Sequence, residues 1–203
     1  MSRRWLDEQK RDSYHRMAKE RGYRSRAAFK LKQLNERFRF LENAKHVLDI
    51  GAAPGGWLQV AREAVGEEGL VVGVDLDKIR SLGLENVKTV VGDIMEAETF
   101  ERIKELLPDR IDVVLSDLAP DVSGAWEVDQ FRQVELARAA MSLAREMLRP
   151  GGWFIVKVFQ GPEYEMYLSE VREVFAFVKV VKPRASRKRS AEVYIVARNL
   201  KVD

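Results

Sequence analysis

The stretch "VLDIGAAPGGWLQVA", Val47 to Ala61, places an apolar run, an aspartate, a loop rich in glycine and a helix-like apolar pattern in immediate succession. Glycine loses more conformational freedom on folding than any other residue, so three glycines close together need a reason. A tight turn is one reason, and close approach of the backbone to a ligand is the other. The order strand, glycine loop, helix is typical of an open parallel sheet that binds a ligand at its carboxyl edge.

The same alternation continues along the chain. Apolar runs predict strands at 46–50, 70–75, 87–93, 111–117, 152–159, 177–183 and 192–198, and amphipathic stretches predict helices near 56–65, 97–107, 127–148 and 163–175. Continuous runs of valine, isoleucine and leucine favour strands buried on both faces, as in a parallel sheet. The segment "RPGGW" (149–153) should stop the long helix before the fifth strand.

The last two strands are joined by only "RASRKRSA" (184–191), which is too short for a crossover helix. They should therefore pair antiparallel. The expected fold class is α/β: a Rossmann-like, seven-stranded, mostly parallel sheet with the last strand antiparallel and helices on both faces.

Length and composition limit the class of protein. The 203 residues, 46% of them hydrophobic, suffice for one domain spanning 1–203. No apolar window approaches a membrane span, and the basic N-terminus lacks the apolar core of a signal peptide, so we expect no membrane partner and a cytoplasmic protein. Cysteine is absent, and the only histidines, His15 and His46, lie far apart in the sequence, so we expect no metal site.

Positive charge gathers at the two ends of the chain. Residues 1–40 carry 13 lysines and arginines against 5 acidic residues, and residues 179–201 carry 8 against 1, whereas 41–178 carry 14 against 25. Solvated surface charge is one interpretation. A shared footprint for the phosphates of a nucleic acid is the other, and it gains weight if the fold brings the two arms together. We interpret 1–40 as a basic, helical N-terminal extension.

Acidic residues close four successive predicted strands: Asp49, Asp75, Asp93 and Asp117. Ligands of open parallel sheets bind at this edge, and an aspartate about 20 residues beyond the glycine loop suits the ribose hydroxyls of NAD and of S-adenosylmethionine equally. Pro54 removes a backbone donor that a pyrophosphate would use, and the acidic rim suits a cationic sulfonium. S-adenosylmethionine is therefore the favoured cofactor, with a nicotinamide dinucleotide as the alternative.

Five motifs together resemble the FtsJ/RlmE family of ribosomal RNA ribose 2′-O-methyltransferases. They are "RSRAAFKL" (24–31), "LDIGAAPGGW" (48–57), "SDLAP" (116–120), "GGWFIVKVFQG" (151–161) and "SRKRSAEVYIVA" (186–197). The resemblance runs from Trp5 to Ala197. It implies a class I methyltransferase fold that binds S-adenosylmethionine.

The resemblance also implies the site. Its catalytic Lys–Asp–Lys–Glu set falls on Lys30, Asp117, Lys157 and Glu192, with Lys30 supplied by the N-terminal extension. The positions implied for cofactor binding are Gly51, Gly55, Gly56, Trp57, Asp75, Leu76, Asp93, Ile94 and Asp117. Lys157 would act as a base when neutral, or orient the acceptor hydroxyl when charged. A purely structural ion pair between Lys157 and Asp117, and simple packing of Trp57 under the loop, are the alternatives.

The activity implied is S-adenosylmethionine-dependent 2′-O-methylation of a ribose, on a uridine, in 23S-type large-subunit ribosomal RNA. The substrate would be the assembled or assembling subunit, and the enzyme a monomer without a metal. A ribose methyltransferase for transfer RNA or an mRNA cap is one alternative. A non-catalytic, RNA-binding ribosome assembly factor is the other.

Overall fold

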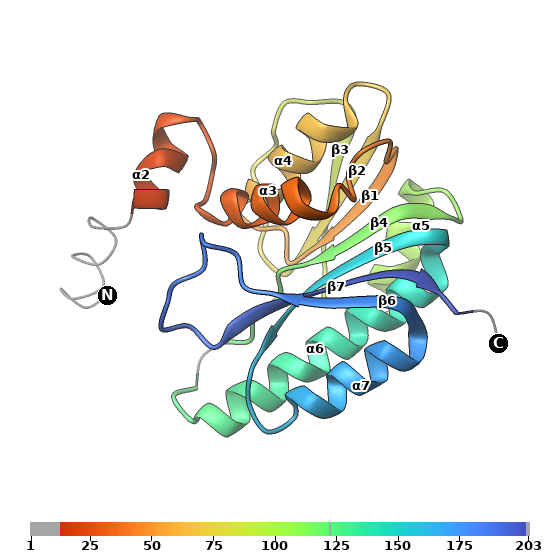
Figure 1. Cartoon of the computed structure of the whole chain (residues 1–203). Coiled ribbons are helices and arrows are strands. Elements are labelled where there is room, and N and C mark those ends of the chain that lie inside the picture. Colours follow the sequence, from red (N-terminus) through yellow and green to blue (C-terminus); the bar gives the residue numbers. More distant parts are fainter. Residues whose placement is uncertain (1–12, 122, 202–203) are drawn as a thin grey trace.

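The apolar and amphipathic segments form seven strands and six helices in the computed structural model, which describes residues 13–121 and 123–201 (Figure 1). The strands are β1 (His46–Ile50), β2 (Leu70–Asp75), β3 (Val87–Val91), β4 (Ile111–Ser116), β5 (Leu148–Phe159), β6 (Phe175–Val181) and β7 (Glu192–Leu200). The helices are α2 (Ser13–Glu20), α3 (Ala27–Phe38), α4 (Gly56–Val65), α5 (Ala97–Leu106), α6 (Trp126–Met147) and α7 (Tyr164–Val174).

All seven strands belong to one sheet, in the order β3-β2-β1-β4-β5-β7-β6. β7 runs antiparallel to β5 and to β6, and every other neighbouring pair is parallel. Six strands therefore share one direction and the last is reversed, which confirms the expected fold class. The strand order changes direction between β1 and β4, and this is where open α/β sheets bind ligands.

Helices cover both faces of the sheet. α3 and α4 pack on one face, and α5, α6 and α7 pack on the other (Figure 1). Successive strand residues point to opposite faces, so Val47 enters the core beside α4 while Leu48 enters the core beside α6. The edge strand β3 departs from the prediction of burial on both faces, because Lys88, Thr89 and Val91 are exposed there.

β5 begins at Leu148, directly after α6 ends at Met147, and so starts earlier than the predicted residue 152. Its pairing with β4 shifts register between Ile111 and Val113. Gly151, with φ of 76°, takes up the left-handed conformation that this irregularity requires. The segment "RPGGW", which was predicted to stop the helix before the strand, therefore lies inside β5 and forms a bulge there.

The two basic arms meet at the carboxyl edge of the sheet. The guanidinium of Arg26 donates to the carbonyl of Ala185, and the side-chain oxygen of Gln33 accepts the N–H of Ala185 at 3.0 Å. α3 thus contacts the β6–β7 connection, residues 182–191, which we call the basic loop. Residues 1–12 of the expected 1–40 extension lie outside the described residues.

Two negative findings apply to residues 13–121 and 123–201. No helix there is both long and apolar enough to cross a bilayer. No group of three or more histidine, cysteine, aspartate or glutamate side chains is arranged there to hold a metal ion.

A buried amide of α6 fixes the end of β5. Gln133 is fully buried, its side-chain nitrogen donates to the carbonyl of Lys157 at 2.6 Å, and its oxygen accepts the N–H of Phe159 at 3.0 Å. One side chain thereby satisfies two backbone groups at the point where the predicted site begins.

Gln133→Leu should destabilise the protein, because it leaves the carbonyl of Lys157 and the N–H of Phe159 without these partners. We expect the free energy of unfolding to fall by about 1–3 kcal/mol, measured by urea denaturation. The neighbouring exposed residue supplies the control, since Arg132→Leu makes a polar-to-apolar change that should cost less than about 0.5 kcal/mol. Equal losses in both variants would contradict this role of Gln133.

Candidate active site

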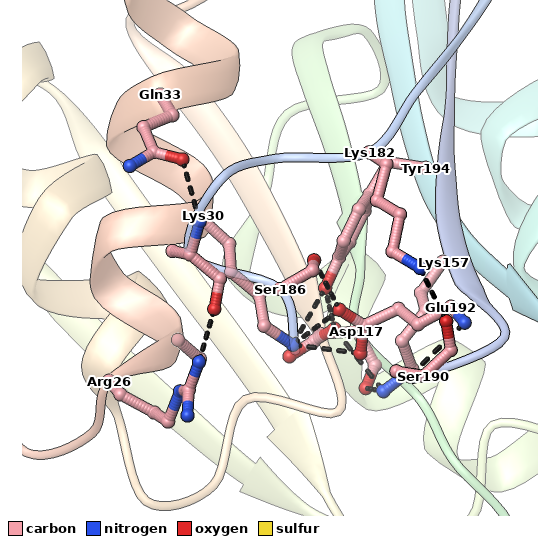
Figure 2. Close-up of polar contacts among 12 residues, drawn as sticks. Arg26, Lys30, Gln33, Asp117, Lys157, Lys182, Ser186, Ser190, Glu192 and Tyr194 are labelled. Carbon is pink, nitrogen blue, oxygen red and sulfur yellow. Dashed lines mark hydrogen bonds and ion pairs between the residues drawn. The ribbon is translucent and has the colours of Figure 1, made fainter. Parts of the chain in front are cut away.

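The four side chains of the predicted catalytic set come from four separate elements and lie together (Figure 2). Lys30 comes from α3, Asp117 directly follows β4, Lys157 lies in β5 and Glu192 begins β7. We call these four residues the tetrad. The tetrad lies at the carboxyl edge of the parallel strands, where the sequence predicts Asp117.

A continuous chain of polar contacts joins the tetrad. Lys30 Nζ lies 2.7 Å from Glu192 Oε1 and donates to Tyr194 Oη at 3.3 Å. The Tyr194 hydroxyl in turn donates to Asp117 Oδ1 at 2.6 Å. That same oxygen lies 3.2 Å from Lys157 Nζ, which also donates to the backbone carbonyl of Asp117 at 2.6 Å. Two lysine side chains and two acidic side chains are thus linked through one phenol.

Strand register explains this convergence. β5 and β7 pair so that Lys157 lies opposite Tyr194 and Phe159 lies opposite Glu192. Side chains two residues apart share a face, so all four point to the side of the sheet that α3 covers. Because β7 is reversed, its first residue rather than its last reaches the carboxyl edge, and Lys30 meets it from α3.

Burial and charge set the protonation of two members of this network. Burial raises the pKa of Asp117, but the charges of Lys157 and Lys30 and the hydrogen bonds from Tyr194 and Lys157 outweigh it, and the net pKa lies below the ordinary value. Burial, followed by the charges of Asp117 and Glu192, raises the pKa of Tyr194 well above its ordinary value. At neutral pH Asp117 is therefore ionised, and Tyr194 keeps the proton that it donates.

A groove of about 270 Å³ opens beside the tetrad. Its lining consists of Arg26, Ala27, Lys30, Arg187, Ser190 and Glu192. Burial and then the nearby charge of Arg187 lower the pKa of Arg26, so two like charges share this wall. Because Lys30 is paired with Glu192, the two guanidiniums give the groove a net positive charge, which suits an anionic ligand.

Two members of the network were not predicted from the sequence. Tyr194 is fully buried and joins the two halves of the tetrad, and Ser186 donates to Glu192 Oε1 at 2.7 Å. The two-residue period of a strand was a usable signal for Tyr194, since it lies two positions beyond Glu192. No comparable signal marks Ser186, because its contact depends on how the basic loop folds back.

The residues predicted to bind a cofactor lie at the ends of β1, β2 and β3. Asp75 Oδ2 accepts the N–H of Ala53 at 2.8 Å and its Oδ1 accepts the N–H of Asp77 at 2.9 Å, so the end of β2 is tied to the glycine loop, residues 51–55. Asp93 Oδ1 accepts the N–H of Met95 at 2.9 Å. A carboxylate has about four acceptor positions, so both aspartates keep capacity for a ligand.

The glycines are required by the protein's own chain. A Cβ on Gly51 would come within 2.9 Å of the backbone nitrogen of Leu118, and one on Gly56 within 2.2 Å of Ser25 Oγ. Gly51 and Gly55 also have positive φ, 77° and 108°. The cluster therefore serves a tight turn and close packing against the segment that precedes α3, which is the first of the two reasons considered above.

The remaining predicted cofactor positions differ in exposure. The Trp57 side chain is buried, and its ring nitrogen donates to the carbonyl of Ala27 at 2.8 Å, so its indole packs under the loop. Leu76 is exposed, whereas Ile94 is partly buried against the core beside α6. Leu76 therefore offers an apolar side-chain surface to a ligand, and Trp57 offers only its backbone.

Asp49 is a fully buried carboxyl in β1 beneath the glycine loop. Among the described residues neither of its oxygens has a hydrogen-bond partner. Burial, and then the charges of Asp117 and Asp75, raise its pKa well above the ordinary value. Three carboxyl groups thus interact electrostatically at this edge. This donor set fits a cationic ligand such as a sulfonium and does not fit a pyrophosphate.

A doubly wound sheet with a reversed seventh strand and a ligand site at its direction change is the architecture of a Rossmann-like methyltransferase. In a comparison with solved structures, this chain is similar to a protein from Plasmodium falciparum described as a ribosomal RNA methyltransferase. The TM-score is 0.76 at 29% identity, over 88% of this chain and 98% of that one.

The sequence comparisons give the family. The model of the FtsJ-like methyltransferases matches residues 23–200, and the chain belongs to that family. A ribosomal RNA large subunit methyltransferase E from Methanothrix thermoacetophila is 52% identical over 94% of this chain and 73% of its own length. One of the same name from Methanothermobacter thermautotrophicus is 46% identical over 99% of this chain and 95% of its own.

Asp49→Asn should change how stability depends on pH. Because the folded pKa of Asp49 is raised, the native state holds a proton that the unfolded chain releases, and the wild-type protein loses stability as pH rises from about 4 through the folded pKa. The variant lacks this loss. The quantity to measure is the Tm of the variant minus the Tm of wild type, by circular dichroism and without ligand. This difference should increase as pH is raised from about 3.5 to about 7.

Asp112→Asn is the matched control with the opposite sign. Burial raises the pKa of Asp112, but hydrogen bonds from Arg149 and from the N–H groups of His46 and Lys45 lower it below the ordinary value. Ionisation of Asp112 stabilises the fold at pH values above the pKa of the unfolded chain. The Tm of this variant minus that of wild type should therefore decrease over the same pH interval. Changes of the same sign in both variants would contradict the account of Asp49.

Proposed function

We propose that this chain transfers a methyl group from S-adenosylmethionine to the ribose 2′-hydroxyl of a uridine in large-subunit ribosomal RNA. The observation that carries the proposal is the contact chain of the tetrad beside the glycine loop. The names of the matched relatives support the ribosomal substrate.

The positive groove supports a polyanionic acceptor. Arg26 and Arg187 line it next to Lys30 and Glu192, and the basic loop continues with Lys188 and Arg189. RNA phosphates supply the negative charge that such a surface attracts, with a strong dependence on salt. A ribose placed in this groove has its hydroxyls beside the tetrad, and we assign the 2′-hydroxyl to Lys157.

S-adenosylmethionine, when bound, supplies an electrophilic methyl carbon on a sulfonium. The tetrad would hold the 2′-oxygen of the ribose facing this carbon, and Lys157, as the neutral amine, would take the hydroxyl proton. Correct alignment of such reactants is worth about 7–11 kcal/mol in favourable cases, whereas a general base contributes about 10²–10⁴-fold. Positioning by the tetrad therefore contributes more than proton removal.

Each tetrad member has a part in that positioning. Ionised Asp117 holds Lys157 through the 3.2 Å contact and through its carbonyl. Lys157 orients the acceptor hydroxyl in either protonation state, and as the neutral amine it takes the proton. Lys30 and Glu192 form the wall of the groove and fix the ribose, while the Tyr194 hydroxyl keeps Asp117 aimed at Lys157.

Lys157→Ala should lower methyl transfer to large-subunit RNA at least about 100-fold, because the orienting amine and the base are lost together. The assay incubates undermethylated large subunits with labelled S-adenosylmethionine and identifies the methylated nucleoside after digestion. Binding of S-adenosylmethionine, measured by calorimetry, should survive. Lys88→Ala, on the exposed edge strand β3, is the matched control and should leave turnover within about twofold.

Near-normal turnover of Lys157→Ala would remove Lys157 from the mechanism. If the labelled methyl group were found only in transfer RNA or at mRNA caps, that RNA and not ribosomal RNA would be the substrate. A wild-type protein that binds no S-adenosylmethionine would act as an RNA-binding assembly factor instead.

Reversing the charges of Arg187, Lys188 and Arg189 to glutamate should weaken binding to ribosomal RNA. Loss of three phosphate contacts should also reduce the slope of log K against log salt by about 2, measured by filter binding at several salt concentrations. The same reversal at Lys88, Arg145 and Arg172, which are exposed elsewhere on the surface, should leave the slope nearly unchanged. Equal slopes for both triple variants would make the basic loop an ordinary solvated segment.

A further inference from the structure

Two aromatic rings stack at the edge of the site. Trp126, the first residue of α6, lies on Phe159, the last residue of β5, with ring centroids 5.9 Å apart and planes at 26°. Trp126 is 48% exposed and Phe159 is half-buried. We call these two residues the aromatic pair. One face of the indole is thus covered by Phe159, and much of the ring is left to solvent.

Phe159 lies on the same face of the sheet as the tetrad, whereas Trp126 belongs to α6, which covers the opposite face. Phe159 is two residues beyond Lys157 in β5 and pairs in register with Glu192. Residues at this spacing share a face and lie about 7 Å apart. The contact with Phe159 therefore places Trp126 at the end of β5, near the tetrad. The start of α6 and the basic loop lie at the same end of the molecule (Figure 1).

The connection that carries Trp126 is held in place. Asp129, one turn into α6, accepts the N–H of Ser123 at 2.8 Å and its hydroxyl at 2.6 Å, and it also accepts the N–H of Gly124 at 3.3 Å. These three bonds fix the backbone just before Trp126. The exposed indole is consequently a positioned surface and not a side chain on a loose loop.

The aromatic pair lies apart from the cofactor residues and next to the basic loop. The glycine loop, Asp75 and Asp93 follow β1, β2 and β3, whereas Phe159 ends β5 and Trp126 begins α6. Phe159 lies opposite Glu192, and the N–H of the next residue, Gln160, donates to the carbonyl of Ala191 in the basic loop at 2.9 Å. A strand of RNA held by the basic loop therefore lies beside both the tetrad and the aromatic pair.

We propose that the aromatic pair is a stacking surface for an unpaired RNA base, that of the methylated nucleotide or of the nucleotide next to it. This inference rests on the proposed function, because it assumes an RNA ribose at Lys157. Proteins that recognise unpaired RNA stack its bases on aromatic side chains, which tolerate any base since every base has a π-face. The basic loop would hold the phosphates, and Trp126 would hold the base beside the tetrad.

Trp126→Ala should raise the KM for protein-free ribosomal RNA about 5- to 150-fold, the effect expected for one lost base–aromatic stack. The kcat should stay within about threefold, because the tetrad is untouched. Trp126→Phe keeps a ring and should recover most of the affinity. Phe131→Ala removes an aromatic side chain of the same helix that is 51% exposed, and it should leave KM unchanged.

An abasic substrate tests stacking itself. An RNA fragment lacking the base at the target nucleotide or its neighbour should have a raised KM with wild type and no further rise with Trp126→Ala. Equal effects of the two alanine variants, or an additive effect of Trp126→Ala and base removal, would overturn the proposal. An effect seen with assembled subunits but not with protein-free RNA would assign the surface to a ribosomal protein. Loss of self-association in Trp126→Ala, by sedimentation, would assign it to a second copy of this chain.

Failure of the proposed function can be distinguished from failure of the stacking surface. Wild-type protein that transfers no methyl to RNA would refute the proposed function alone. Anisotropy with a labelled single-stranded RNA then tests the aromatic pair without catalysis, since Trp126→Ala should still weaken binding and Phe131→Ala should not. Equal binding by wild type and Trp126→Ala would overturn the stacking surface even if methyl transfer were demonstrated.

Discussion

Because β7 runs antiparallel between β5 and β6, its first residue lies at the edge where its parallel neighbours end. Glu192 can meet Lys30 only in this arrangement, and the same register places Tyr194 opposite Lys157. A parallel β7 would carry its last residue to this edge and leave Glu192 at the far end of the sheet. The direction of one strand therefore decides whether the four charged groups form one network.

In this network Lys157 has both a structural role, as the ion-pair partner of Asp117, and a position from which it can serve the proposed reaction. A buried ammonium needs a partner, because an unpaired charge in the interior costs several kcal/mol. Asp117 supplies the partner, and the contact is present as the structural interpretation expects. The pair nevertheless sits at the open rim of the sheet beside a positive groove. Pairing thus keeps a lysine at this position, and the position gives it access to an acceptor.

Much of the fold could be predicted because it depends on local pattern. The bounds of β1, β2 and α4 coincide with their apolar runs, and the short connection predicts the reversal of β7. The early start of β5 was missed because Gly151 lies in a bulge. Tetrad identities came from motifs, whereas the contacts of Tyr194, Ser186 and Gln133 depend on register and loop folding between distant segments. Asp49 was placed correctly at the edge, but its lack of partners is a property of packing.

A short segment, from Arg24 to Lys30, connects the glycine loop to the positive groove. Arg24 donates to the carbonyl of Pro54 at 3.1 Å and to that of Ser81 at 2.7 Å, so the residues before α3 lie directly on the loop. Six positions further on, Lys30 contacts Glu192 in the wall of the positive groove. Gly55 has a φ of 108°, a conformation that favours glycine, and a Cβ there would displace the end of the Arg24 side chain. The basic extension therefore couples the glycine loop to the positive groove, and its charged side chains serve packing within the fold.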